Sequence, residues 1–260
     1  MNSNILHLAN PQREVEKITD FIQSILKRSH KEKVVIAVSG GIDSALSLGI
    51  LSKTIPLYNI YPIFLPYNKQ DMSDAKLLVK RLNIPKENWQ EVNIENIVNS
   101  VAELQEINKD DQLRLGNIMA RSRMIVVYDL AKKLNALVCG TENKSEKYLG
   151  YFTRFGDEAS DFEPIVHLYK TQVRQLVEHL DLPDVFLSKA PSAELWQDQT
   201  DEQELGFCYA EADLIIDQIY FDKMALDNFL NNFDITEETV EKVINRVNSV
   251  KFKHQVPYTF

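Results

Sequence analysis

One short stretch, residues 39–44 (SGGIDS), constrains the fold more than any other part of the sequence. It follows a β-branched apolar run at residues 34–38 and precedes the apolar residues 45–51. This order predicts a buried strand, a tight glycine turn and a helix. The first backbone N–H groups of a helix lack intrahelical partners, and the helix dipole makes that end positive. The sequence therefore predicts an anion site suited to a phosphate group.

Asp43 is an unexpected member of this stretch, because a carboxylate repels phosphate. A Mg²⁺ ion between them would explain it, since Mg²⁺ binds through one or two carboxylates together with substrate phosphates. The stretch has neither the lysine of a Walker A loop nor the spacing of G-x-G-x-x-G. It resembles the pyrophosphate-binding loop of the ATP pyrophosphatases, which cleave ATP between the α and β phosphates and adenylate a substrate. The alternative is an ordinary glycine turn before a helix.

Strand and helix patterns alternate along the first half of the chain. We expect strands at residues 58–67, 90–94 and 136–140, and helices at 11–29, from 71 onward and at 116–135. Such alternation predicts an α/β fold, doubly wound, with a mainly parallel sheet and helices on both faces. We expect one domain over residues 1–260. Ligands of such sheets bind beyond the carboxyl ends of the strands, which here are residues 39–44 and 140–146.

Two segments depart from simple amphipathic patterns. Residues 150–161 contain glycines, aromatic and charged residues without periodicity, which predicts a functional loop. The expected helix at 116–135 is apolar on most sides between residues 124 and 131. A helix that is apolar all round is buried, either in the core or against a partner chain.

Composition excludes several classes of protein. The chain has 260 residues and a formal net charge of −9, which argues against broad binding to nucleic acid or anionic membranes. Cys139 and Cys208 are its only cysteines, so we expect no disulfide framework and no cysteine-rich metal site. We see neither a signal peptide nor an apolar run long enough to span a membrane, and we expect a cytoplasmic protein.

Several further motifs occur in a fixed order after the SGGIDS stretch. They are GNIMAR at 116–121, GTENKSE at 140–146, GYFTRFGD at 150–157, Asp161, Lys170, APSA at 190–193 and DEQELG at 201–206. Together these motifs resemble those of the ammonia-dependent NAD synthetases, over residues 39 to about 253. The resemblance implies an adenine nucleotide alpha hydrolase-like fold and a homodimer. We expect no glutaminase domain, because neither cysteine lies in a recognisable nucleophile setting.

The resemblance implies a ligase that uses deamido-NAD, ATP and ammonia. ATP converts the nicotinate carboxylate of deamido-NAD into an acyl-adenylate and pyrophosphate leaves. Ammonia then attacks the acyl carbon, and AMP departs as NAD forms. Mg²⁺ is the implied cofactor and ATP the co-substrate, because such chemistry needs the phosphate charges to be neutralised.

The resemblance also implies roles for individual residues. Implied ATP contacts are Ala37, Val38, Ser39, Gly40, Gly41, Ile42, Asp43, Ser44, Thr141, Lys170 and Ser192. Implied deamido-NAD contacts are Arg121, Arg154, Asp161, Phe252 and Lys253. Implied Mg²⁺ ligands are Asp43 and Glu146, and implied catalytic residues are Asp43, Lys170 and Asp157. Three positions depart from the commoner family pattern: Arg154 replaces lysine, Ser192 replaces threonine, and Phe252 replaces histidine or tyrosine.

Two alternative functions remain open at this point. One is another adenylating enzyme of the same superfamily, acting on a purine nucleotide or tRNA. Sulfur-transferring members need reactive, often paired cysteines, and a tRNA enzyme usually carries a basic face. The other is a non-catalytic nucleotide-binding module, which would have little reason to keep two carboxylates together with the loop at 150–161.

Overall fold

A parallel β-sheet forms the centre of the protein. The computed structural model describes residues 6–108, 110–192, 195–196 and 199–259. Within these residues the sheet has four strands in the order β3-β2-β1-β4. The strands are β1 (Val34–Ala37), β2 (Ile60–Phe64), β3 (Gln90–Glu91) and β4 (Leu137–Cys139). The chain moves outward from β1 to β3 and then returns to the other side of β1. The sheet therefore has its topological switch point between β1 and β4, directly beside the SGGIDS stretch.

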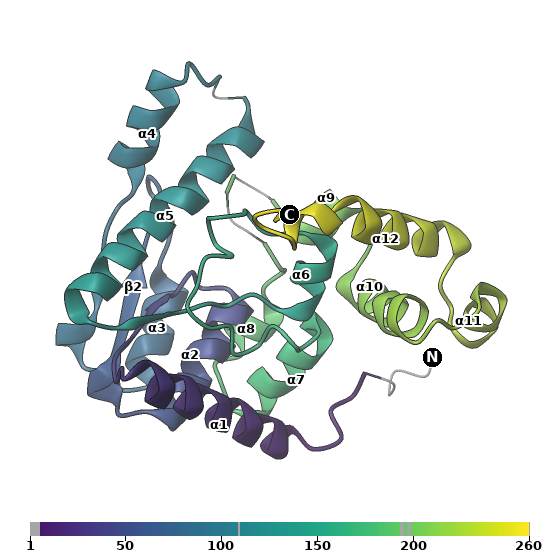
Figure 1. Ribbon diagram of the computed structural model, residues 1–260, viewed down its shortest axis with the longest axis horizontal. Coiled ribbons are helices and arrows are strands. Elements are labelled where there is room, and N and C mark those ends of the chain that lie inside the picture. The colour runs from purple at the N-terminus through teal and green to yellow at the C-terminus, as the bar shows by residue number, and fades with distance from the viewer. Residues whose placement is uncertain (1–5, 109, 193–194, 197–198, 260) are drawn as a thin grey trace.

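Helices cover both faces of this sheet, as the sequence predicts. In chain order they are α1 (Pro11–Ser29), α2 (Ile42–Thr54), α3 (Ser73–Arg81), α4 (Glu95–Leu104), α5 (Gln112–Leu134), α6 (Lys144–Leu149), α7 (Lys170–His179), α8 (Val185–Ser188), α9 (Asp201–Leu205), α10 (Tyr209–Ile215), α11 (Leu226–Asn232) and α12 (Glu237–Ser249). A π-helical segment, Ile216–Phe221, continues α10. Figure 1 shows α4 and α5 at one side of the molecule, α1 at another, and α10, α11 and α12 gathered at one end.

Alternation along β1 assigns its side chains to two separate cores. Val34 and Ile36 pack in the cluster that contains residues of α1, α2 and α7, whereas Val35 packs with residues of α5. All three side chains are fully buried. A strand covered on both faces needs apolar residues at every position, which explains its continuous apolar run.

The second strand is short but not interrupted. Two prolines within 58–67 predict a short or interrupted strand, and β2 has five residues, ends before Pro66 and is continuous through Pro62. Pro62 lies opposite Ile36 in the β1 ladder, and β2 begins to pair with β3 only at Ile63. The missing N–H of Pro62 therefore costs no ladder bond on the β3 side.

The C-terminal helices have a hydrophobic cluster of their own. Residues of α6, α10, α11 and α12 form it together with Leu6 from the N-terminal segment. This cluster places α10 against α6 and α7, the two helices that begin at the candidate site. In the described parts of the chain, no helix has the length and apolar character needed to cross a bilayer.

Candidate active site

The SGGIDS stretch forms a self-supported loop between β1 and α2, which we call the phosphate loop (residues 39–44). Gly40 has a φ of 91°, a conformation that favours glycine. The Oγ of Ser39 accepts a hydrogen bond from the Gly41 N–H at 3.1 Å, and the Ser44 Oγ donates to the Gly41 carbonyl at 3.0 Å. The loop is thus held by its own hydroxyl groups, with the start of α2 directly behind it, as an anion site requires.

A pocket of about 580 Å³ opens beside this loop. It lies at the carboxyl ends of β1 and β4 and is bounded by α5, the loop at 150–157, the start of α7 and residues 189–192. The predicted site residues that line it are Ala37, Val38, Ser39, Gly41, Ile42, Asp43, Ser44, Arg121, Thr141, Glu146, Arg154, Asp157, Lys170, Ser192 and Lys253. Gly40, Asp161 and Phe252 do not line it. Ala193, the last residue of the APSA motif, lies outside the described residues.

Three of these side chains form a buried ion-pair cluster. Lys170 is only 4% exposed, and its Nζ donates to Asp43 Oδ2 at 2.6 Å and to Glu146 Oε1 at 2.8 Å. The Asn143 amide donates to the other Asp43 oxygen at 2.8 Å. Burial by itself lowers the pKa of Lys170, but the two carboxylates outweigh it and raise that pKa above its usual value. Lys170 is therefore a permanent cation at the centre of the pocket.

The same cluster can be tested for its fit to a divalent cation. Burial, followed by the neighbouring Asp43, raises the pKa of Glu146, and Lys170 opposes the shift. A carboxylate in this position is stabilised by additional positive charge. Among the described residues no group of three or more His, Cys, Asp or Glu side chains could hold a metal. Mg²⁺ commonly takes one or two carboxylates and completes its shell with water and phosphate oxygens. Asp43 and Glu146, which converge on one Nζ, fit that requirement.

We use the name cationic wall for Arg121, Arg154 and Lys253, which line the same pocket, together with Phe252, which lies against Arg154. Arg121 Nε donates to the Arg154 carbonyl at 3.3 Å, and the Arg154 guanidinium lies 5.3 Å from the centre of the Phe252 ring. Lys253 Nζ donates to the Phe152 carbonyl at 2.8 Å. Burial lowers the pKa of Lys253 below its usual value. The structure thus gathers four of the five predicted deamido-NAD contacts.

Asp157 and Asp161 support the loop that carries Arg154. Asp157 Oδ1 accepts the Thr153 N–H at 3.0 Å and closes a turn beside the pocket. Asp161 Oδ2 accepts the Val138 N–H at 2.7 Å, which ties the end of this loop to β4. In this structure Asp161 braces the strand.

Three other residues near Lys170 have no role predicted from the sequence. Asp201 is 3% exposed, its Oδ2 accepts the Tyr209 hydroxyl at 3.0 Å, and its Oδ1 has no partner among the described residues. The Tyr209 ring centre lies 5.1 Å from Lys170 Nζ. Asn143, as described above, holds Asp43. Asn143 and Asp201 lie inside the GTENKSE and DEQELG motifs, so the motifs pointed to these positions without giving their contacts.

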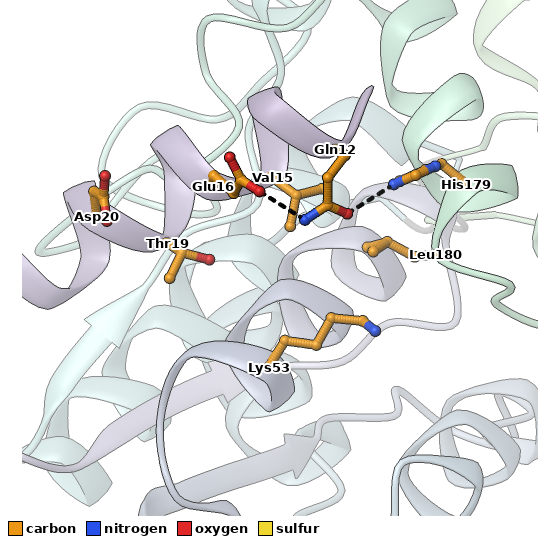
Figure 2. A pocket seen from close by; sticks show the side chains of 8 residues that line it. All are labelled: Gln12, Val15, Glu16, Thr19, Asp20, Lys53, His179 and Leu180. Atoms are coloured by element: carbon orange, nitrogen blue, oxygen red, sulfur yellow. Dashed lines mark hydrogen bonds between the residues drawn. The ribbon is translucent and has the colours of Figure 1, made fainter. Parts of the chain in front are cut away.

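A second pocket, of about 400 Å³, lies on the surface between α1, α2 and α7. Figure 2 shows the Gln12 amide between Glu16, at 3.0 Å, and His179, at 3.3 Å, with Lys53 facing the same space. None of the motif residues lines it. The motif chemistry is concentrated in the larger pocket.

Comparison with known proteins identifies the family. The family model described as NAD synthase matches residues 14–257. The chain belongs to the NAD synthase family. It is 37% identical over 243 residues to the NH(3)-dependent NAD(+) synthetase of Pyrococcus furiosus, with 93% of each chain covered. This relationship confirms the family that the ordered motifs indicated.

Solved structures of NAD synthase relatives agree with the fold. The structure of NMN synthetase from Francisella tularensis is 34% identical, with a TM-score of 0.81, and the match covers 96% of this chain and 98% of that one. The NH3-dependent NAD synthetase of Campylobacter jejuni, in complex with nitrate, is 31% identical with a TM-score of 0.79, covering 96% and 99%. The predicted α/β fold is therefore confirmed.

Proposed function

We propose that this protein makes NAD by ATP-dependent amidation of deamido-NAD with ammonia. The observation that carries the proposal is the buried Asp43–Lys170–Glu146 cluster beside the phosphate loop, in one pocket with a cationic wall. A carboxylate does not react with ammonia, because oxide is not a feasible leaving group. Activation by ATP is therefore required. The cluster lies beside the phosphate loop, where the phosphates of ATP would bind.

In the first half-reaction a nicotinate oxygen attacks the α-phosphorus of ATP, and the bond to pyrophosphate breaks. The phosphate loop offers the free N–H groups of α2 and the Ser39 and Ser44 hydroxyls to the phosphates. Lys170 stabilises the negative charge that builds on them. Asp43 and Glu146 would hold Mg²⁺, which supplies charge neutralisation on the phosphate oxygens when bound.

In the second half-reaction ammonia attacks the acyl carbon, the bond to AMP breaks and one proton is lost. Arg121, Arg154 and Lys253 offer positive charge to the phosphates of deamido-NAD, and Phe252 supports Arg154 from behind. Burial of the pocket limits hydrolysis of the adenylate by water. Nothing in this scheme uses Cys139, whose pKa is raised by burial in the core.

We further propose that α5 forms the interface of a homodimer. Leu113 and Ile125, on this helix, are 65% and 56% exposed, and Leu113 also lines the pocket. The sequence predicts that this helix is apolar on most sides around Ile125, more than one buried face requires. Arg121 lies one helical turn from Ile125, so the interface would adjoin the cationic wall. Sedimentation equilibrium at micromolar concentration should give twice the mass of one chain, and Ile125→Asp should give a monomer. A fully active wild-type monomer would contradict this assembly.

A second candidate function is amidation of a mononucleotide. It is favoured by the likeness to the Francisella NMN synthetase, because NMN would arise from its carboxylate analogue, nicotinate mononucleotide. The two acceptors share the nicotinate group and differ in the adenylate half. The same pocket chemistry serves either one.

The test measures amide formation from deamido-NAD and from nicotinate mononucleotide, each with ATP, Mg²⁺ and ammonium. We expect the higher kcat/KM with deamido-NAD, and poor replacement of ammonium by glutamine. Labelled pyrophosphate should exchange into ATP only when the nicotinate substrate is present, and without any ammonia. Exchange that needs no nicotinate substrate, or that demands ammonia, would refute the adenylate mechanism.

A further inference from the structure

Asp213 is a fully buried carboxylate that lies outside the pocket. It sits on α10, in the C-terminal helical layer, and does not line the pocket. Its Oδ2 accepts hydrogen bonds from the Thr171 N–H at 3.0 Å and the Thr171 hydroxyl at 2.9 Å. Its Oδ1 accepts one from the Ser145 hydroxyl. Three donors thus converge on one side chain. Burial of a carboxylate costs desolvation free energy, which these hydrogen bonds offset, and the network fixes the positions of its members.

The partners of Asp213 are the sequence neighbours of two predicted site residues. Ser145 directly precedes Glu146, near the start of α6, and Thr171 directly follows Lys170, at the start of α7. The Ser145 Oγ also accepts the backbone N–H of Lys170 at 2.8 Å. Asp213 and Ser145 therefore connect the first turns of two separate helices through a single hydrogen-bonded network.

We infer that Asp213 is a positioning residue that fixes the separation of Glu146 and Lys170 for binding of metal and ATP. This inference rests on the proposed function. Glu146 is a candidate ligand of the ion, and Lys170 is a candidate phosphate contact. The distance between their side chains decides whether both can act on one nucleotide. Some residues do not touch a metal but hold its ligands in place through hydrogen bonds. Removal of such a residue commonly lowers metal affinity or activity by about 10- to 100-fold.

A backbone bond also joins the two segments, from the Lys144 N–H to the Leu168 carbonyl at 2.8 Å, but it ends before Lys170. The contact of Lys170 with Glu146 is a side-chain ion pair, which has to open when a cation enters between the carboxylates. The network through Ser145 and Asp213 is made by groups that face away from the pocket. It can therefore persist while the ion pair rearranges. It keeps the first turns of α6 and α7 at a fixed distance from each other.

The test compares Asp213→Asn with a matched control, Val243→Ala. Asparagine keeps the size of the side chain but turns one acceptor into a donor. Val243 is fully buried in the same helical cluster and makes no contact with Ser145 or Thr171 through hydrogen bonds. Calorimetric titration of each protein with ATP, at a series of MgCl₂ concentrations and without deamido-NAD, gives the apparent Mg²⁺ affinity. Thermal unfolding of each variant measures its general loss of stability.

We expect Asp213→Asn to weaken the apparent Mg²⁺ affinity by about 10- to 100-fold. Excess MgCl₂ should restore its ATP binding. Val243→Ala should unfold at a lower temperature and keep the wild-type Mg²⁺ dependence. Equal Mg²⁺ dependence in Asp213→Asn and wild type, or equal shifts in both variants, would overturn the positioning role. Wild-type ATP binding that ignores Mg²⁺ would instead overturn the proposed function.

Ser145→Ala provides a second variant should Asp213→Asn fail to fold. It removes the bridge to the Lys170 N–H and leaves both Thr171 bonds to Asp213 in place. It should weaken the Mg²⁺ affinity in the same direction. A wild-type Mg²⁺ dependence in Ser145→Ala would likewise overturn the inference.

Discussion

Residues of the phosphate loop and of the cationic wall line one pocket, but the two groups are built in different ways. The loop is six consecutive residues whose hydroxyl groups bond to its own backbone. The wall is assembled from distant segments: Arg121 and the Arg154 carbonyl are 33 residues apart, and Lys253 reaches Phe152 over 101 residues. The loop is thus shaped locally, whereas the wall exists only when the whole chain has folded.

This difference separates two kinds of mutational effect. The loop side supplies fixed dipoles and the buried Lys170, so we assign to it the chemistry at the phosphates. The wall supplies exposed or half-buried cations: Arg121 and Lys253 bond to backbone carbonyls, and Arg154 lies over the Phe252 ring. We therefore assign to it the binding of the dinucleotide. Changes on the loop side should alter kcat, and changes on the wall should alter KM.

The largest effect should come from Lys170→Ala. Removing one preorganised electrostatic contact typically costs on the order of 10²- to 10³-fold in rate, so pyrophosphate exchange should fall by about that factor. The variant also leaves Asp43 and Glu146 close together without their cation, which should lower its thermal stability. Lys53→Ala, on the surface pocket of Figure 2, serves as a control and should exchange at the wild-type rate. Undiminished exchange in Lys170→Ala would show that the phosphate chemistry does not depend on the loop side of the pocket.

A moderate effect is expected for Arg154→Ala. The KM for deamido-NAD should rise about tenfold, which corresponds to loss of roughly 1.4 kcal/mol of binding. The kcat and the KM for ATP should change much less, because the phosphate loop is untouched. Steady-state kinetics with each substrate varied in turn measures this, and Arg154→Lys, the commoner residue of the family, should recover part of the affinity. An equal rise in both KM values would show that the wall and the loop do not act separately.

The smallest effect on turnover is expected for Glu142→Gln, behind the pocket. Glu142 is 8% exposed, and burial, followed by the nearby Glu163, raises its pKa to about 9. The unfolded chain ionises this group near pH 4.5, so wild-type stability should fall as the pH rises from about 4.5 to 9. Glutamine cannot ionise. The variant should therefore unfold at a higher temperature than wild type at pH 8, with much less gain at pH 5. An equal gain at both pH values would contradict the assigned cause.

The parts of the structure set by short-range patterns were predictable from the sequence. The helix expected at 11–29 is α1, because Pro11 stands at its start and Asn10 caps it by accepting the Arg13 N–H. The strand, turn and helix around the phosphate loop followed from its apolar flanks and its glycines. The third strand was expected at 90–94. The ladder assigns only Gln90–Glu91, although the Val92 N–H still bonds to the carbonyl of Phe64, the last residue of β2, and the Ile94 N–H to that of Pro66 beyond it.

Contacts between distant segments were not predictable in the same way. Asp43, Glu146 and Lys170 come from α2, α6 and α7; the chemistry of the phosphate loop pointed to Asp43, whereas the family motifs were needed to point to Lys170 and to pair Glu146 with Asp43. That Lys170 bonds to both carboxylates follows from helix packing, which no local pattern encodes. The same holds for Asp213, whose network joins α10 to α6 and α7. The helix α6 has six residues, too few for a periodic signal.

The position of Lys170 affects the stability of the protein when no nucleotide is bound. Proteins that fold around a structural metal unfold when a chelator removes it, because the free energy of metal binding is part of their folding free energy. Here the lysine is a built-in counter-ion that compensates Asp43 and Glu146 at 2.6 and 2.8 Å. In the proposed reaction, Asp43 and Glu146 would hold the ion together with the phosphates of the nucleotide, and Lys170 would compensate the two carboxylates when no nucleotide is bound.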